Sequence, residues 1–192
     1  MQPTSKPTGG TNHPTGVSSS RACLILTAEP AAGKTCLMSQ IVMHTLRREH
    51  SDLIPILIKV QDLQRRLLIE AHAAVFGRTW NWVDAYLQCV HGVESDVYRM
   101  LRQALLARRA LILLDGIDEG GKRRAEIERH VVEVLAPQGH VMLVTSRPNG
   151  LREELFREHF VHVKLEPLSD AQQRAVIERR VGKGERAERL VE

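Results

Sequence analysis

One ten-residue stretch, Leu26-Thr27-Ala28-Glu29-Pro30-Ala31-Ala32-Gly33-Lys34-Thr35, constrains the fold of this chain more than any other. An apolar run over 22–27 leads into it, and a helical pattern begins at Lys34. A strand followed by Gly-Lys-Thr and a helix is typical of a loop that wraps phosphates. Its backbone N–H groups point inward, the lysine reaches the β- and γ-phosphates, and the Thr hydroxyl ligates Mg²⁺. The residues expected to hold a nucleoside triphosphate are Ala28, Glu29, Pro30, Ala31, Ala32, Gly33, Lys34, Thr35 and Cys36.

Two alanines depart from the usual form of this loop. Ala28 stands where the pattern has its first glycine, and Ala31 stands where many such loops have another. Glycine accepts positive φ and lets a phosphate approach closely, whereas alanine has a steric cost in that region. The loop geometry and the nucleotide affinity therefore depend on how these alanines are accommodated. A protein that binds nucleotide without hydrolysing it stays open as an alternative.

A second motif follows at 111–119, where four apolar residues precede Asp115-Gly116-Ile117-Asp118-Glu119. This pattern predicts a buried parallel strand, and ligands bind at the carboxyl ends of such strands. Asp115 is predicted to hold Mg²⁺ together with Thr35. Asp118, or Glu119 in second place, is predicted to orient the attacking water. A strand followed by a solvated acidic turn is the alternative interpretation.

A third apolar run, 141–144, ends in Thr145, Ser146 and Arg147. Polar groups thus follow this strand too, as the phosphate loop and the acidic motif follow the other two strands. Arg147 is a candidate contact for the γ-phosphate, because guanidinium offers paired donors to phosphate oxygens. An ordinary surface arginine is the alternative.

The three segments AEPAAGKT, LILLDGIDE and VMLVTSRP, in this order, resemble the Walker A, Walker B and sensor 1 segments of NACHT domains. NACHT domains are nucleotide-switch modules of the STAND class of P-loop ATPases. The small residue after the first Asp of DGIDE, followed by two more acidic residues, is the most specific part of the likeness. Two further segments, 53–63 and 161–177, also resemble the family, so the likeness spans about 22–181.

The resemblance implies an α/β, three-layer αβα P-loop NTPase fold with a five-stranded parallel sheet, in which the VMLVTS strand lies between the other two motif strands. The apolar runs predict the strands at 22–27, 53–60, 110–115, 141–145 and 160–165. The expected organisation is a disordered segment at 1–20, a NACHT-like domain at 21–181, and a charged tail at 182–192 that begins a helical or winged-helix region.

Helical patterns lie between these strands. The first, 34–48, is expected to bury five apolar residues, and Ser169 is expected to cap the last helix. The apolar residues are Leu37, Met38, Ile41, Val42 and Leu46. The other expected helices are 80–90, 93–110, 123–135, 150–158 and 169–181. Trp80, Trp82 and Tyr86 are expected in the core.

The function implied by the resemblance is an ATP- and Mg²⁺-dependent switch of a signalling or innate-immunity-type protein. It would cycle slowly between ATP and ADP and act on other protein domains or subunits in the cytoplasm. A P-loop small-molecule kinase is the alternative from another class, although no acceptor pocket or arginine lid stands out in the sequence. A GTPase is disfavoured because no Asn-Lys-x-Asp string occurs.

Composition argues against several other classes. The net charge is +4, the basic residues come as scattered pairs, and aromatic residues make up only 4%, which disfavours nucleic acid as a partner. No apolar run approaches the roughly 18 residues of a membrane span. The three cysteines and nine histidines show no CxxC or HExxH spacing, which argues against a disulfide framework or structural metal and fits a reducing compartment.

Overall fold

A computed structural model describes residues 23–48 and 51–182 of the 192-residue chain. The expected disordered segment at 1–20 and nearly all of the expected tail lie outside the described residues.

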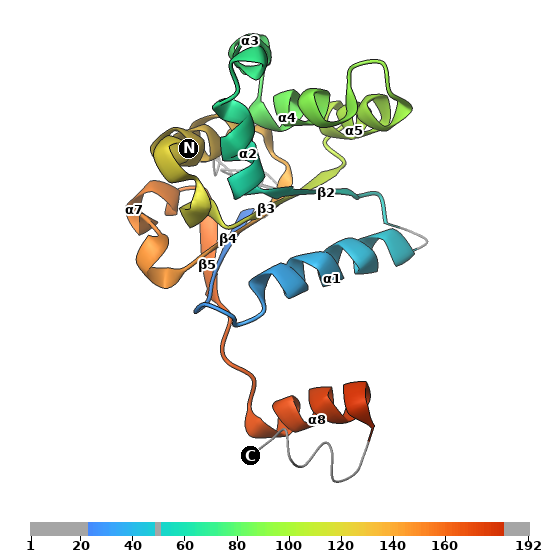
Figure 1. Cartoon of the computed structure of the whole chain (residues 1–192), viewed down its shortest axis with the longest axis vertical. Coiled ribbons are helices and arrows are strands. Elements are labelled where there is room, and N and C mark those ends of the chain that lie inside the picture. The colour runs from blue at the N-terminus through green and yellow to red at the C-terminus, as the bar shows by residue number, and fades with distance from the viewer. Residues whose placement is uncertain (1–22, 49–50, 183–192) are drawn as a thin grey trace, which may run out of the picture.

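Five parallel strands form one sheet in the order β2-β3-β4-β1-β5 (Figure 1). They are β1 (Cys23–Thr27), β2 (Ile54–Lys59), β3 (Ala110–Asp115), β4 (Val141–Ser146) and β5 (Phe160–Lys164). The strand with VMLVTS, β4, therefore lies between β1 and β3, as predicted. Since all strands are parallel, the three motifs end at the same edge of the sheet.

The two edge strands differ from the inner ones in their sequence pattern. The inner strand β3 is buried over Ala110–Leu114, which explains its continuous apolar run. On β5 only Phe160 is buried, and Val161 is 61% exposed. On β2, Ile54 donates its N–H to Arg109 O, so the nitrogen of the next residue, Pro55, faces the open edge. Proline is tolerated in a strand at such an edge position.

Helices cover the two faces of the sheet unequally (Figure 1). On one face lies α1 (Lys34–Arg47), whose Met38 packs in a cluster with Leu26 and Leu113. The larger core cluster lies on the other face, beneath the remaining helices of the domain. These are α2 (Val60–Leu67), α3 (Glu70–Arg78), α4 (Trp82–His91), α5 (Asp96–Leu106), α6 (Arg124–His130) and α7 (Glu153–Phe156).

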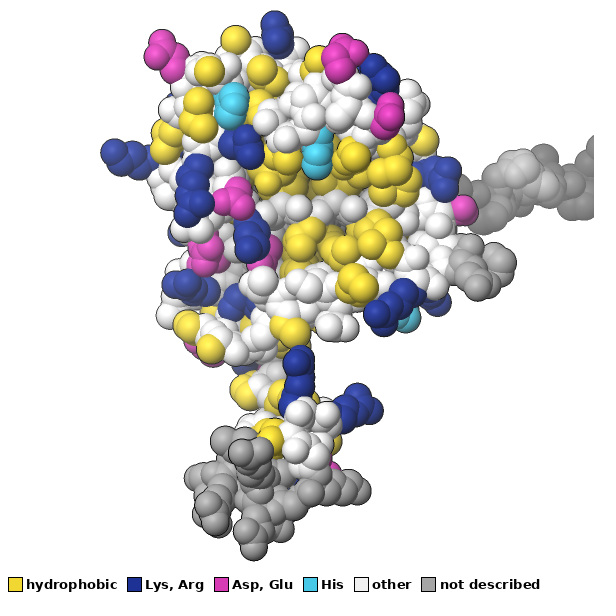
Figure 2. Space-filling view, turned by 45° about the vertical axis from the view of Figure 1, so that its right-hand side comes forward, with side chains coloured by type: hydrophobic (Ala, Val, Ile, Leu, Met, Phe, Trp, Pro, Cys, Tyr) yellow, Lys and Arg dark blue, Asp and Glu magenta, His cyan; other side chains and the backbone are white. Residues whose placement is uncertain are grey.

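Short turns complete the connections. The helix α6 continues as a π-helical turn over Val131–Leu135 and a 3₁₀ turn over Ala136–Gln138. Further 3₁₀ turns are Ile117–Glu119, Gly121–Arg123 and Pro148–Gly150. On the side of the molecule where α1, β2 and α5 lie, hydrophobic side chains gather in a band (Figure 2).

Several helix predictions were wrong in detail. The helices α2 and α3 were not predicted, because segments of eight and nine residues are too short for a clear helical period. Leu46 is 64% exposed, since α1 is the only helix on its face among the described residues. Trp80 is 40% exposed because it precedes α4, whereas Trp82 and Tyr86 pack against the core. The expected helix at 150–158 is reduced to the four residues of α7.

The last described helix, α8 (Asp170–Val181), stands apart from the sheet in Figure 1 and has no buried residue. Its N-terminus confirms the predicted cap. The Ser169 side chain accepts from the N–H of Gln172, and the Gln172 side chain accepts from the N–H of Ser169. Among the described residues, no helix is long and apolar enough to cross a bilayer.

Candidate nucleotide-binding site

The loop between β1 and α1 is shaped by a hydrogen bond to β4 and by hydrogen bonds within the loop. Ala28 is fully buried, and its N–H donates to Ser146 O on β4 at 3.2 Å. The N–H of Ala32 donates to Glu29 O at 3.2 Å, which closes a turn. Gly33 has φ +91°, and α1 begins directly after it. The loop therefore makes a sharp reversal immediately before the helix.

Ala31 adopts φ +61°, a left-handed conformation that alanine rarely takes. Alanine thus takes a conformation here that glycine adopts more easily, at a cost of about 1 kcal/mol of local strain.

The start of α1 carries the positive charge of the site. No side chain caps the first turn, so its first N–H groups lack a side-chain partner there. The Nζ of Lys34 donates to Ala28 O at 2.5 Å and to Glu29 O at 2.9 Å. The ammonium thus folds back over the loop, beside the free N–H groups of the helix. This arrangement suits an anion such as a phosphate.

A cavity of about 290 Å³ lies at this point. Its lining joins the loop to residues that come more than eighty positions later, namely Glu119 and Arg147. The remaining lining residues are Pro30, Ala31, Gly33, Lys34, Thr35 and Cys36. The structure therefore brings the loop and the two later motifs to one place.

Asp115, the last residue of β3, has both carboxylate oxygens in hydrogen bonds. Oδ2 accepts from Thr35 Oγ1 at 2.7 Å, and Oδ1 accepts from Thr145 Oγ1 at 2.7 Å. Thr145 Oγ1 in turn accepts from the N–H of Gly116 at 2.9 Å. A hydroxyl and a carboxylate side by side are the hard oxygen donors that Mg²⁺ prefers, and Mg²⁺ usually binds few protein ligands besides phosphates and water. The pair Thr35 and Asp115 thus fits the ion.

Asp118 is held more tightly than Glu119. Gly116, at φ +77°, turns the chain back so that both carboxylates face the end of β4. Asp118 Oδ1 accepts from the backbone N–H of Arg147 at 3.2 Å and lies 3.4 Å from Ser146 Oγ. The Asp118 side chain is 9% exposed, whereas that of Glu119 is 46% exposed. A carboxylate with fixed partners keeps a fixed direction.

The Arg147 guanidinium lies between the two carboxylates. Its Nε is 3.5 Å from Asp118 Oδ2, and a terminal nitrogen is 3.4 Å from Glu119 Oε1. Arg147 is therefore part of the site, at the rim of the cavity. The hydroxyls of Thr145 and Ser146 were recognised in the sequence only as polar strand-end groups. Their bonds to Asp115 and Asp118 follow from the pairing of β4 beside β3.

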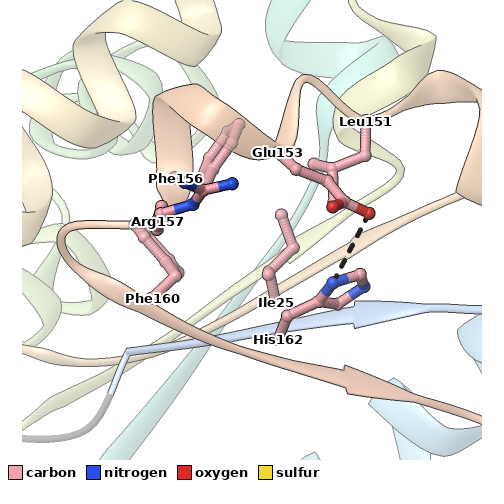
Figure 3. Close-up of a pocket in the computed structure, with 7 residues that line it drawn as sticks. All are labelled: Ile25, Leu151, Glu153, Phe156, Arg157, Phe160 and His162. Carbon is pink, nitrogen blue, oxygen red and sulfur yellow. Dashed lines mark ion pairs between the residues drawn. The ribbon is translucent and has the colours of Figure 1, made fainter.

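A second cavity, of about 260 Å³, lies between α7 and the strands β1 and β5 (Figure 3). His162 links two of its sides: Nδ1 is 3.7 Å from Glu153 Oε1, and Nε2 is 2.8 Å from the hydroxyl of Thr27. The rings of Phe156 and Phe160 form part of the apolar lining. Thr27 is the residue before the phosphate loop, so His162 connects this cavity to the end of the strand that leads into the loop.

The strand-loop-helix unit and the carboxylates on neighbouring strand ends define a nucleotide-binding P-loop NTPase. The chain belongs to the NACHT domain family, whose sequence profile matches residues 22–183. The family resemblance noted in the three motifs is thereby confirmed.

Two solved structures that resemble this chain are distant from it in sequence. A STAND protein with a tetratricopeptide repeat sensor from Pyrococcus horikoshii is 12% identical, with a TM-score of 0.49, over 90% of this chain and 25% of the other. The C. elegans protein PCH-2 is 15% identical, with a TM-score of 0.46, over 85% of this chain and 40% of the other. This chain thus spans less than half the length of either. The search of curated proteins returned no match.

Proposed function

We propose that this domain binds ATP with Mg²⁺, hydrolyses it slowly, and acts as a nucleotide-dependent switch. The observation that carries the proposal is the hydrogen bond of 2.7 Å between Thr35, at the start of α1, and Asp115, at the end of β3. It joins the phosphate loop to the acidic motif beside a cavity that Lys34 and Arg147 also line. A surface loop and an unrelated acidic turn would not share such a contact.

The residues divide into three roles. Lys34 and the first N–H groups of α1 bind the phosphates, and the Lys34 ammonium exchanges the carbonyls of its own loop for phosphate oxygens. Thr35 and Asp115 would hold Mg²⁺, which when bound shields the charge between the β- and γ-phosphates. Asp118 accepts a hydrogen bond from the attacking water and orients it, with Glu119 as the more exposed alternative.

Arg147 supplies the switching element. Its guanidinium pairs with Asp118 and Glu119 within the site. A γ-phosphate carries more negative charge than either carboxylate, so it competes for the same donors. The partner of Arg147 would then differ between the triphosphate and diphosphate states. We infer that other protein domains or subunits, in the cytoplasm, respond to this difference.

Two alternative functions make different demands on the site. A small-molecule kinase needs an acceptor pocket close to the γ-phosphate and several arginines that close over it. Within the described residues, Arg147 is the only arginine that lines the loop cavity. A binding-only protein needs the loop but not the water-orienting carboxylate, which here has its own fixed partners. Asp118, whose side chain is only 9% exposed and has fixed partners, favours hydrolysis.

The test uses the 192-residue chain. Titration with a fluorescent ATP analogue, with Mg²⁺ and with EDTA, measures binding, and release of inorganic phosphate measures hydrolysis. We expect binding that weakens in EDTA and turnover below about 1 s⁻¹. Absence of Mg²⁺-dependent binding contradicts the proposal. Binding without any phosphate release supports the binding-only function, and turnover that requires an added acceptor supports the kinase.

A further inference from the structure

Glu128 on α6 is a fully buried carboxylate held between two arginines. Its Oε1 accepts from Arg124 Nε at 2.7 Å, and its Oε2 accepts from Arg152 Nε at 2.5 Å and also contacts a terminal nitrogen of that guanidinium. A buried carboxylate lowers stability unless it is paired and hydrogen-bonded. Here both oxygens have cationic partners.

The two arginines connect different parts of the chain. Arg124 lies one turn before Glu128 on α6 and also donates to the carbonyl of Gly150. Arg152 follows the 3₁₀ turn Pro148–Gly150 that leaves β4. The three charged groups therefore fix α6 to the segment 148–152, although nothing in this set contacts the phosphate loop directly.

The segment fixed in this way packs against Asp118. An added Cβ on Gly150 would lie 2.6 Å from the Cβ of Asp118 and 3.2 Å from its carboxyl carbon. The backbone of Gly150 therefore forms one wall of the space in which the Asp118 side chain sits. Arg147 N–H and Ser146 Oγ contact the carboxylate itself. A shift of the 148–152 segment would change the direction of Asp118.

We propose that Glu128, together with Arg152 and Arg124, is a positioning group for hydrolysis that acts through Gly150 on Asp118. The inference rests on the proposed role of Asp118 in orienting water. It predicts that loosening the ion pair slows hydrolysis and leaves nucleotide binding intact, because the loop residues that bind phosphate are untouched.

Arg152→Ala is the most useful variant, because Glu128 keeps its pair with Arg124. We expect phosphate release at saturating ATP to fall about ten-fold, while the affinity for fluorescent ATP changes less than about two-fold. Arg152→Lys keeps a cation and should recover part of the rate. Arg129→Ala, which removes an exposed ion pair with Glu133 on the same helical segment, is the matched control and should leave both quantities unchanged.

Gly150→Ala tests the same contact without touching the ion pairs. The added methyl group displaces Asp118, so hydrolysis should slow while affinity is retained. An unchanged rate in both Arg152→Ala and Gly150→Ala overturns the proposal. A parallel loss of rate and affinity in Arg152→Ala also overturns it, since that pattern indicates general loosening of the site.

A double-mutant comparison separates this inference from the proposed function. If Arg152 acts through Asp118, Arg152→Ala slows Asp118→Asn no further. A multiplicative loss shows an independent effect and overturns the positioning role. If Asp118→Asn hydrolyses ATP at the unaltered rate, the role proposed for Asp118 is wrong, and the role proposed for Glu128 is wrong with it. Where Asp118→Asn has no measurable rate, Gly150→Ala takes its place in the comparison.

Discussion

The two halves of the site are held together in different ways. In the phosphate loop, Lys34 bonds to carbonyls five and six positions earlier in the chain. In the acidic half, Asp115 and Asp118 depend on Thr145 and Arg147, about thirty positions later. Apart from the bond between Ala28 N–H and Ser146 O, the loop is a local structure, whereas the acidic half is assembled by the order of strands in the sheet. Damage to the first should therefore change binding, and damage to the second should change hydrolysis or stability.

The largest effect should come from the loop. Lys34→Ala removes the main counter-charge of the phosphates. We expect affinity for fluorescent ATP to fall about 100-fold, because several charge-assisted hydrogen bonds to phosphate oxygens are lost. Lys122→Ala, an exposed lysine outside the lining of the cavity, is the control. Equal affinities of Lys34→Ala and the unaltered chain would remove the loop from the binding site.

Substitutions in the acidic half should slow hydrolysis and leave nucleotide binding intact. In Asp118→Asn the side chain keeps its size but loses its charge, so we expect phosphate release to slow by a factor on the order of 10 to 100 while ATP stays bound. Glu119→Gln, measured in parallel, should be affected less because its side chain is more exposed and less constrained. The reverse result would exchange the roles of the two carboxylates.

Thr145→Val tests whether the acidic half depends on β4. The hydroxyl is fully buried, donates to Asp115 and accepts from Gly116 N–H, so its loss leaves two groups short of a partner. We expect the free energy of unfolding in urea to fall by about 1–2 kcal/mol. Thr45→Val is the control, since its hydroxyl bonds only to the carbonyl of Ile41 in the same helix. Equal losses in both variants would argue against cross-strand assembly.

The smallest effect concerns strain in the loop. Ala31→Gly relieves the strain of φ +61° but adds entropy to the unfolded chain, so the two contributions nearly cancel. Ala32→Gly only adds entropy to the unfolded chain and relieves no strain, because Ala32 is not among the positive-φ residues. We expect Ala31→Gly to be more stable than Ala32→Gly by about 1 kcal/mol in urea unfolding. If the order is reversed, the left-handed loop conformation is wrong.

The contrast between local and long-range contacts also explains how much of the fold and of the site the sequence predicted. The strands followed from short apolar runs whose physical meaning is local, whereas the position of β4 and the meeting of the three motifs at one edge followed from the resemblance to NACHT domains. The ion pairs of Glu128 and the packing of Gly150 on Asp118 could not be predicted, because they depend on how α6 lies against a segment more than twenty residues later. The helices α2 and α3 were missed because their short apolar patterns gain stability only from tertiary packing.

The proline of β2 has a consequence for self-association. An open edge strand beside a band of hydrophobic side chains is where a second chain could add a strand and start an aggregate (Figure 2). Pro55 offers no N–H at the open edge, so an added strand there would leave one of its own carbonyls without a partner. Growth of a continuous intermolecular sheet along β2 is thereby penalised.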